Sequence, residues 1–98
     1  MNDLPTRDQF AEHLKEEFVV SAEGRETVVI LDRVSDLEKH GMQEGFSLFF
    51  TAPGDSGILQ YLYTVKHPAL PEMELFLVPI ALDERGLRLQ AAFSQLTL

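Results

Sequence analysis

The chain has 98 residues, a length that suits one domain and is too short for two. It has no cysteine, which excludes disulfides and thiol chemistry, while 45% hydrophobic residues are enough for one core. Its net charge of −8 repels phosphate backbones, so no nucleic-acid partner is expected. With no signal-peptide pattern and no apolar run of about 20 residues, the sequence predicts a cytoplasmic protein without a membrane partner.

The chain opens with a helix-start pattern. Thr6 stands three residues before Gln9, which is typical of a capping box. Phe10, Leu14 and Phe18 then recur four residues apart and form one apolar stripe. We therefore expect an amphipathic helix over about 6–17 that packs on the rest of the domain.

The hydrophobic period then changes to two, which predicts strands over about 18–96. The first two strands form a hairpin around Gly24. The second, over 27–34, is nearly continuous in apolar residues and is either buried on both faces or bulged. The polar stretch 36–45 is expected to be a loop. Four further strands are predicted over 46–51, 59–66, 73–78 and 87–93, with Pro79 indicating an edge or a bulge.

These elements predict a mainly β (α+β) fold for 1–98 as a single domain. An N-terminal amphipathic helix would pack on a six-stranded antiparallel barrel or sandwich, because turn signals recur about every ten residues. The pattern does not choose between barrel and sandwich.

Two motifs have a chemical and a structural interpretation. Gly54-Asp55-Ser56-Gly57 resembles the nucleophile segment of trypsin-like serine proteases, but that fold needs a longer chain, so a tight turn is expected. The histidines His13, His40 and His67 are widely separated, and no pair has the spacing that puts two ligands on one helix face. They are interpreted as structural.

Paired carboxylates also have two interpretations. Glu72 and Glu74 lie on the same face of a strand and suit acid–base work or a weak cation site, although acids that block edge pairing are commoner. No phosphate-binding loop or cysteine–histidine array occurs. The sequence therefore predicts no catalytic, cofactor or metal site, and the protein is not expected to be an enzyme.

The aromatic residues provide the best functional lead. Phe49 points away from Phe46 and Phe50 on the third strand, so it is core if the helix covers that face and part of an exposed patch if not. The candidate interaction surface is Phe49, Glu74, Phe76 and Pro79, and the candidate pocket lining is Tyr61 and Tyr63.

The order of segments resembles a family of uncharacterised bacterial domains of about this size. The matching segments are Leu-Pro-Thr-Arg-Asp-Gln-Phe at 4–10, Phe-Ser-Leu-Phe-Phe at 46–50, His-Pro at 67–68 and Glu-Leu-Phe-Leu-Val-Pro-Ile at 74–80, with a similar last strand ending near Ala92 and Phe93. Members resemble neighbours of phage-tail-collar-type proteins in bacterial genomes. The resemblance implies an accessory to a tail-like or appendage assembly and brings no catalytic residues.

Three functions follow as hypotheses. The first is a non-catalytic module that binds a protein partner, or itself, through a strand edge or an apolar patch. The second is a barrel that binds a small apolar ligand in a cavity lined by Tyr61, Tyr63 and Phe76. The third is a small enzyme in which His67, Glu72 and Glu74 meet in a cleft.

Overall fold

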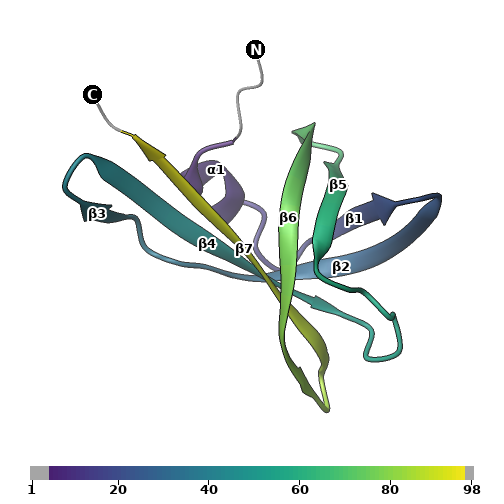
Figure 1. The fold of residues 1–98 in the computed structure, drawn as a ribbon. Coiled ribbons are helices and arrows are strands. Elements are labelled where there is room, and N and C mark those ends of the chain that lie inside the picture. Colours follow the sequence, from purple (N-terminus) through teal and green to yellow (C-terminus); the bar gives the residue numbers. More distant parts are fainter. Residues whose placement is uncertain (1–4, 97–98) are drawn as a thin grey trace.

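The computed structural model describes residues 5–96 (Figure 1). One short helix precedes seven strands, and every strand pairing is antiparallel. The prediction of a mainly β, antiparallel domain is confirmed. The elements are α1 (Arg7–Ala11), β1 (Glu17–Ala22), β2 (Arg25–Val34), β3 (Glu38–His40), β4 (Gln43–Ala52), β5 (Tyr61–His67), β6 (Leu70–Asp83) and β7 (Gly86–Leu96).

Six of the strands form a ring of pairings. The sheet order is β2-β1-β5-β6-β7-β4-β3, and β2 also pairs with β4. Leu31 lies opposite Phe50 and Val34 opposite Leu48 in this closing ladder. Each of the six strands therefore has two partner strands within the ring. The short β3 extends from β4 outside the ring (Figure 1).

Alternating side chains fill the ring. On β4, Leu48 and Phe50 are buried while Phe49 between them is half-buried on the outside, as period-two patterning requires. Leu77 and Leu89 contribute from β6 and β7. The largest fully buried side chains are Phe10, Phe18, Phe50, Leu31, Leu48, Leu77, Leu89, Val20, Val29 and Val65.

The helix is shorter than the sequence predicted. The capping box is present, with the Gln9 N–H donating to Thr6 Oγ1 over 3.2 Å and the Thr6 N–H donating to Gln9 Oε1 over 2.8 Å. However, α1 ends at Ala11, Leu14 is 41% exposed, and Phe18 belongs to β1. The prediction of one long amphipathic helix over 6–17 was wrong because the chain turns away before a second helical turn is complete.

Phe10 connects this short helix to the core. Its ring is fully buried, with its centroid 6.1 Å from that of Phe46 and 5.7 Å from that of Phe93. Phe46 and Phe93 stack on each other at 4.8 Å where β4 and β7 pair. The helix thus lies at one end of the ring, near the Phe46 and Phe93 ends of these strands, and leaves the outer face of Phe49 uncovered.

Two further details of the strands differ from or refine the expectations. The stretch 36–45 is not all loop, because β3 pairs with the start of β4 around Gly41, whose φ is 64°. Its three residues are all exposed, so no hydrophobic alternation reveals it. The β2 and β6 ladders have register shifts at Leu31/Arg33 and Pro79/Ala81, which are the bulges that the sequence left as alternatives.

Candidate functional site

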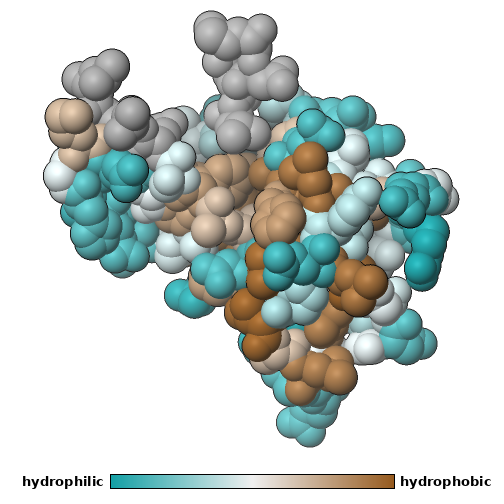
Figure 2. Space-filling view, viewed as in Figure 1, coloured by the Kyte–Doolittle hydropathy of each residue, from teal (hydrophilic) through white to brown (hydrophobic). Residues whose placement is uncertain are grey.

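An apolar face lies on the outside of β4, β6 and β5. Leu62 and Phe76 are directly opposite each other and are 49% and 51% exposed. Val78, two residues beyond Phe76, pairs with Gln90 of β7, which in turn pairs with Phe49 of β4. We call Phe49, Leu62, Phe76, Val78 and Ile80 the outer apolar face. Figure 2 shows hydrophobic surface distributed down the side on which β6 lies nearest the viewer.

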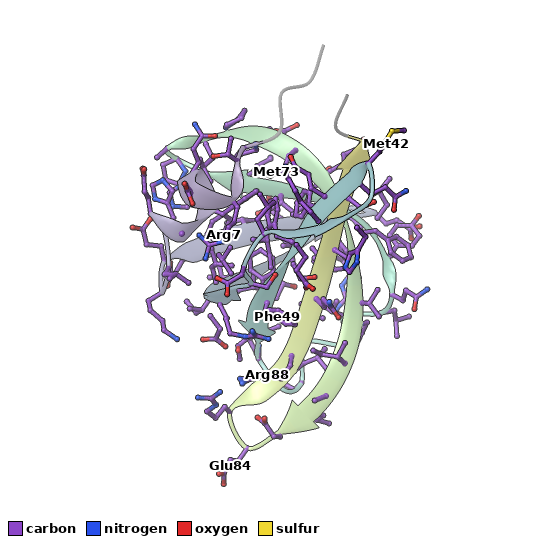
Figure 3. All side chains as sticks on the ribbon, turned by 90° about the vertical axis from the view of Figure 1, so that its left-hand side faces the viewer. Arg7, Met42, Phe49, Met73, Glu84 and Arg88 are labelled. Carbon is purple, nitrogen blue, oxygen red and sulfur yellow. The ribbon has the colours of Figure 1, made fainter. Side chains whose placement is uncertain are left out.

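Phe49 forms the better-covered part of this face. The Arg33 guanidinium lies 4.0 Å from its ring centroid in a cation–π contact. Phe49 and Ile80 line the same shallow cavity together with Arg88. In Figure 3, Phe49 lies between Arg88 and the upper part of the molecule, with Glu84 at the tip of the β6–β7 turn. Phe49 is neither core nor fully exposed.

The residues proposed as an interaction surface divide between two sides of the sheet. Glu74 and Phe76 are exposed and share one face of β6 with Val78, whose partner Gln90 on β7 also pairs with Phe49 of β4. Pro79 pairs with the buried Leu89 and lies at the register shift, so alternation directs it to the inner side. Its role is in the bulge rather than on the outer apolar face.

A cavity of about 300 Å³ lies at the start of β5, beside the tip of the β1–β2 hairpin. Tyr61 and Tyr63 both line it, with ring centroids 5.9 Å apart. The Tyr63 hydroxyl donates to the Leu59 carbonyl oxygen over 2.8 Å, and the Tyr61 hydroxyl donates to Glu23 over 3.1 Å, which raises the pKa of Tyr61 above its usual range. Phe76 lies on the outer apolar face and does not line this cavity.

The Gly54-Asp55-Ser56-Gly57 segment borders the same cavity. Ser56 donates its backbone N–H to the Pro53 carbonyl oxygen, and Gly57 has a φ of 71°, as a tight turn requires. Among the described residues the buried Ser56 hydroxyl has no hydrogen-bond partner, and no histidine lines the cavity around it. The segment therefore has the geometry of a turn.

Three ionisable side chains, two from the α1–β1 turn and one from the end of β5, meet at the α1 end of the ring. Glu16 Oε1 lies 2.9 Å from His13 Nδ1 and 2.7 Å from His67 Nε2. The two imidazole centroids are 4.4 Å apart. The ring of Phe18, on β1, lies 4.6 Å from the ring of His67, on β5. We call His13, Glu16 and His67 the His–Glu–His cluster. The hydrogen bond from His67, followed by that from His13, lowers the pKa of Glu16 below its usual range.

The turn between α1 and β1 positions this cluster. Lys15 has a φ of 68°, which is uncommon for a residue with a side chain and brings Glu16 back beneath His13. The Lys15 N–H donates to the Leu31 carbonyl oxygen over 2.7 Å, and the Leu31 N–H donates to the Glu16 carbonyl oxygen over 3.1 Å. The strained turn is thus hydrogen-bonded to β2, and the carboxylate is directed toward the end of β5.

A second polar group surrounds Asp32 at the β2 bulge. Its carboxylate accepts hydrogen bonds from Thr51 and Lys15 and lies 3.4 Å from Arg88 Nη1. Burial raises the pKa of Asp32, but the Thr51 and Lys15 hydrogen bonds and the charges of Lys15 and Arg88 together outweigh it and leave the pKa below its usual range. The group joins β2, β4 and β7 on the outside of the ring.

The histidine cluster was missed in the sequence. The spacing between histidines does not reveal it, because His13 and His67 are far apart along the chain. The three-residue spacing of His13 and Glu16 was the available signal, because such pairs share one side of a helical turn. His67 does not meet Glu72 and Glu74 as hypothesised; Glu72 lies 3.9 Å from Lys66 instead.

The fold and these groups define a small antiparallel β domain with a closed ring of strand pairings and separate surface features. A family model described as a domain of unknown function, DUF6916, matches residues 5–93. The chain belongs to this family. No curated protein and no solved structure matches it. Within the described residues, no helix is long and apolar enough to cross a membrane.

Proposed function

We propose that this domain is a non-catalytic interaction module that binds another protein through the outer apolar face. The observation that supports the proposal is the directly opposed pair Leu62 and Phe76, each half exposed, beside Val78 and Ile80. Single exposed apolar residues are common on protein surfaces, but a contiguous group on neighbouring strands is typical of an interface.

The face is a better candidate than a strand edge. The ring leaves β3 as the terminal strand of the described sheet, although β2 and β6 each pair with one neighbour at a time along their length. Outside the ring, β3 has only three residues, all exposed, with the polar sequence Glu-Lys-His. An added strand would gain little from so short a polar edge, whereas Phe76 and Leu62 offer apolar area directly.

The charge of the chain favours a different protein over a second copy as the occupant. Each chain carries a net charge of −8, so two copies brought together through the same face repel each other. Glu74 is exposed beside Phe76 on the same strand. The partner is therefore a protein with an apolar patch that has basic residues opposite Glu74 and acidic residues opposite the Arg33 and Arg88 end of the face. As a more specific version we propose an accessory or assembly factor of a phage-tail-like or appendage system, the role that the resemblance stated for the sequence implies.

The test compares two surface variants. Leu62→Ser with Phe76→Ser removes the exposed pair, and Val28→Ser is the matched control, because Val28 is 47% exposed on β2 outside the outer apolar face. Partners are captured from native cells with the tagged wild-type protein, and the purified pair is then titrated by calorimetry. We expect the double variant to weaken binding about 100-fold, about tenfold for each side chain, and Val28→Ser to change it by less than about threefold.

Two results would overturn this proposal. One is a partner that binds the double variant as tightly as the wild type. The other is a wild-type dimer in sedimentation analysis that the double variant abolishes, because the occupant would then be a second copy. Increased salt should weaken the expected complex, since charged residues of the partner face residues of opposite charge around the outer apolar face.

The cavity lined by Tyr61 and Tyr63 supports a second candidate, the binding of a small apolar ligand. Its volume of about 300 Å³ lies at the lower end of ligand pockets. Val20 and Ile58 add apolar walls. Binding of the apolar fluorescent probe anilinonaphthalene sulfonate to the folded wild type, and its loss in Tyr63→Ser but not in Val28→Ser, would favour this candidate over the interaction module.

A further inference from the structure

We propose that the His–Glu–His cluster is a binding site for a divalent transition-metal ion of the Zn²⁺ type. It presents two imidazole nitrogens and one carboxylate oxygen whose ligand atoms all lie within 4.8 Å of one another. Two histidines and one carboxylate are a ligand set that Zn²⁺ and its first-row neighbours use, with the remaining position taken by water or substrate.

The distances between the three ligand atoms must change from hydrogen-bonding values to those of ligands around a metal ion. Ligand atoms around a tetrahedral Zn²⁺ are roughly 3.3 Å apart when each bond is about 2.0 Å long. The Glu16 oxygen now lies 2.9 Å from one nitrogen and 2.7 Å from the other, as hydrogen bonds require. An outward movement of the Glu16 carboxylate by about half an ångström brings these two distances to that value, because hydrogen-bonded atoms are closer than co-ligands. The two imidazole nitrogens, which lie within 4.8 Å of each other, must reach the same separation. Its side chain is 47% exposed and is free of the packing that would resist this movement.

The two imidazoles are held more firmly than the carboxylate. His67 is 6% exposed and lies between the rings of His13 and Phe18. His13 is fixed from the other side by the backbone of the α1–β1 turn, where the strained Lys15 is hydrogen-bonded to β2. Two well-packed imidazoles and one exposed carboxylate therefore form a site with one side accessible to water.

The cluster contains one more histidine than is needed to hold the α1–β1 turn against the end of β5. One histidine hydrogen bond to Glu16 would connect the α1–β1 turn to the end of β5. The second imidazole bonds to the same oxygen, Oε1, and so adds no new connection for that atom. It does complete the minimum of three protein ligands that catalytic-type Zn²⁺ sites have.

The Ala69 amide distinguishes the metal-free state from the metal-bound state. Its N–H donates to His67 Nδ1 over 3.0 Å, so in the neutral imidazole the ring proton is on Nε2 and points to Glu16. Metal coordination through Nε2 requires that proton to move to Nδ1, where it faces the Ala69 N–H. The imidazole stays neutral, and no proton is lost overall. The exposed two-residue turn at Pro68 and Ala69 must then shift away from the ring.

The experiment is a titration of the metal-free, full-length protein with ZnCl₂ by calorimetry, followed by Co²⁺ titration with visible absorption. We expect one ion per chain and the d–d absorption of a tetrahedral site. His13→Gln and Glu16→Gln should each weaken Zn²⁺ binding by at least about tenfold, because each removes one of three ligands. His40→Gln is the matched control, since His40 is an exposed histidine that lies 3.9 Å from Glu38 outside the cluster.

A backbone signal provides the second measurement. In amide NMR spectra of the wild type, saturating Zn²⁺ should shift the Ala69 resonance, and the shift should be absent in Glu16→Gln. Circular dichroism checks that each variant is folded, and His13→Gln serves if Glu16→Gln does not fold. Equal Zn²⁺ affinity in His13→Gln and His40→Gln, or no heat and no Ala69 shift in the wild type, would overturn the proposal.

Discussion

Replacement of Phe10 by alanine tests whether α1 is an integral part of the core. Phe10 is completely buried and contacts the stacked rings of Phe46 and Phe93. Removal of a buried Phe side chain loses about 2 to 3 kcal/mol of transfer free energy, and the remaining cavity brings the cost to about 3 to 5 kcal/mol. That is about a fifth or more of the net stability of about 5 to 15 kcal/mol expected for a domain of this size.

The upper end of this range is expected. α1 has five residues, which is too short for a helix that is stable without tertiary contacts. Loss of Phe10 therefore releases α1, and the half-buried Phe46 and Phe93 become more exposed. The free energy of unfolding can be measured by urea titration with far-ultraviolet circular dichroism, because its linear dependence on denaturant gives the difference between variants.

Leu14→Ala is the matched control, since Leu14 belongs to the same predicted apolar stripe but is 41% exposed. We expect it to cost less than about 1 kcal/mol. Equal costs for the two variants, or a cost below about 1 kcal/mol for Phe10→Ala, would refute the assignment of Phe10 to the core and would favour the longer amphipathic helix over 6–17.

Two other predictions concern the ring itself. The pKa of Asp32 is lowered in the folded protein, so its carboxylate stabilises the fold above the usual Asp pKa, and this contribution is lost as the pH falls through the lowered value. Urea titrations from about pH 4 downward should show a flatter decline of stability for Asp32→Asn than for the wild type, because the Asn amide has no negative charge to lose beside Lys15. Gly86→Ala should lower the free energy of unfolding by about 3 to 5 kcal/mol, because φ is 133° and a Cβ would overlap the Ala52 carbonyl oxygen. Gly24→Ala should lower it by about 1 to 2 kcal/mol, because φ is 80° but the space around the Cβ is open. Similar thermal midpoints for the two glycine variants would contradict this packing.

Local alternation predicted most of the strands because it depends on neighbouring residues. The inward set on β4 and the outward position of Phe49 both follow from a period of two. The end of α1 could not be predicted in this way. Leu14 continues the four-residue apolar spacing, but the left-handed conformation of Lys15 turns the chain, and that conformation is stabilised by Leu31 in another strand.

Long-range pairing explains what the sequence left open at the candidate sites. Whether Phe49 is covered depends on where the helix docks, and Phe10 directs it to the end of the ring near Phe46 and Phe93. The cluster of Glu16 and His67 joins residues 51 positions apart. Periodicity contains no information about such a contact, so the cluster emerges only when the ring closes.

The two proposed sites share the β5–β6 hairpin, yet a change at one need not reach the other. The outer apolar face includes Leu62 and Phe76, which pair inside the ladder, whereas His67 pairs with Leu70 at its last position beside the turn. A register shift between Val65 and His67 separates the turn from the regular part of that ladder. In addition, β1 pairs with β5 at Thr64, Val65 and Lys66, next to the turn, so a movement of the turn is opposed by this ladder on the β5 side. Failure of Zn²⁺ binding would therefore leave the interaction proposal standing, and a partner that ignores the Leu62 and Phe76 pair would leave the metal proposal standing.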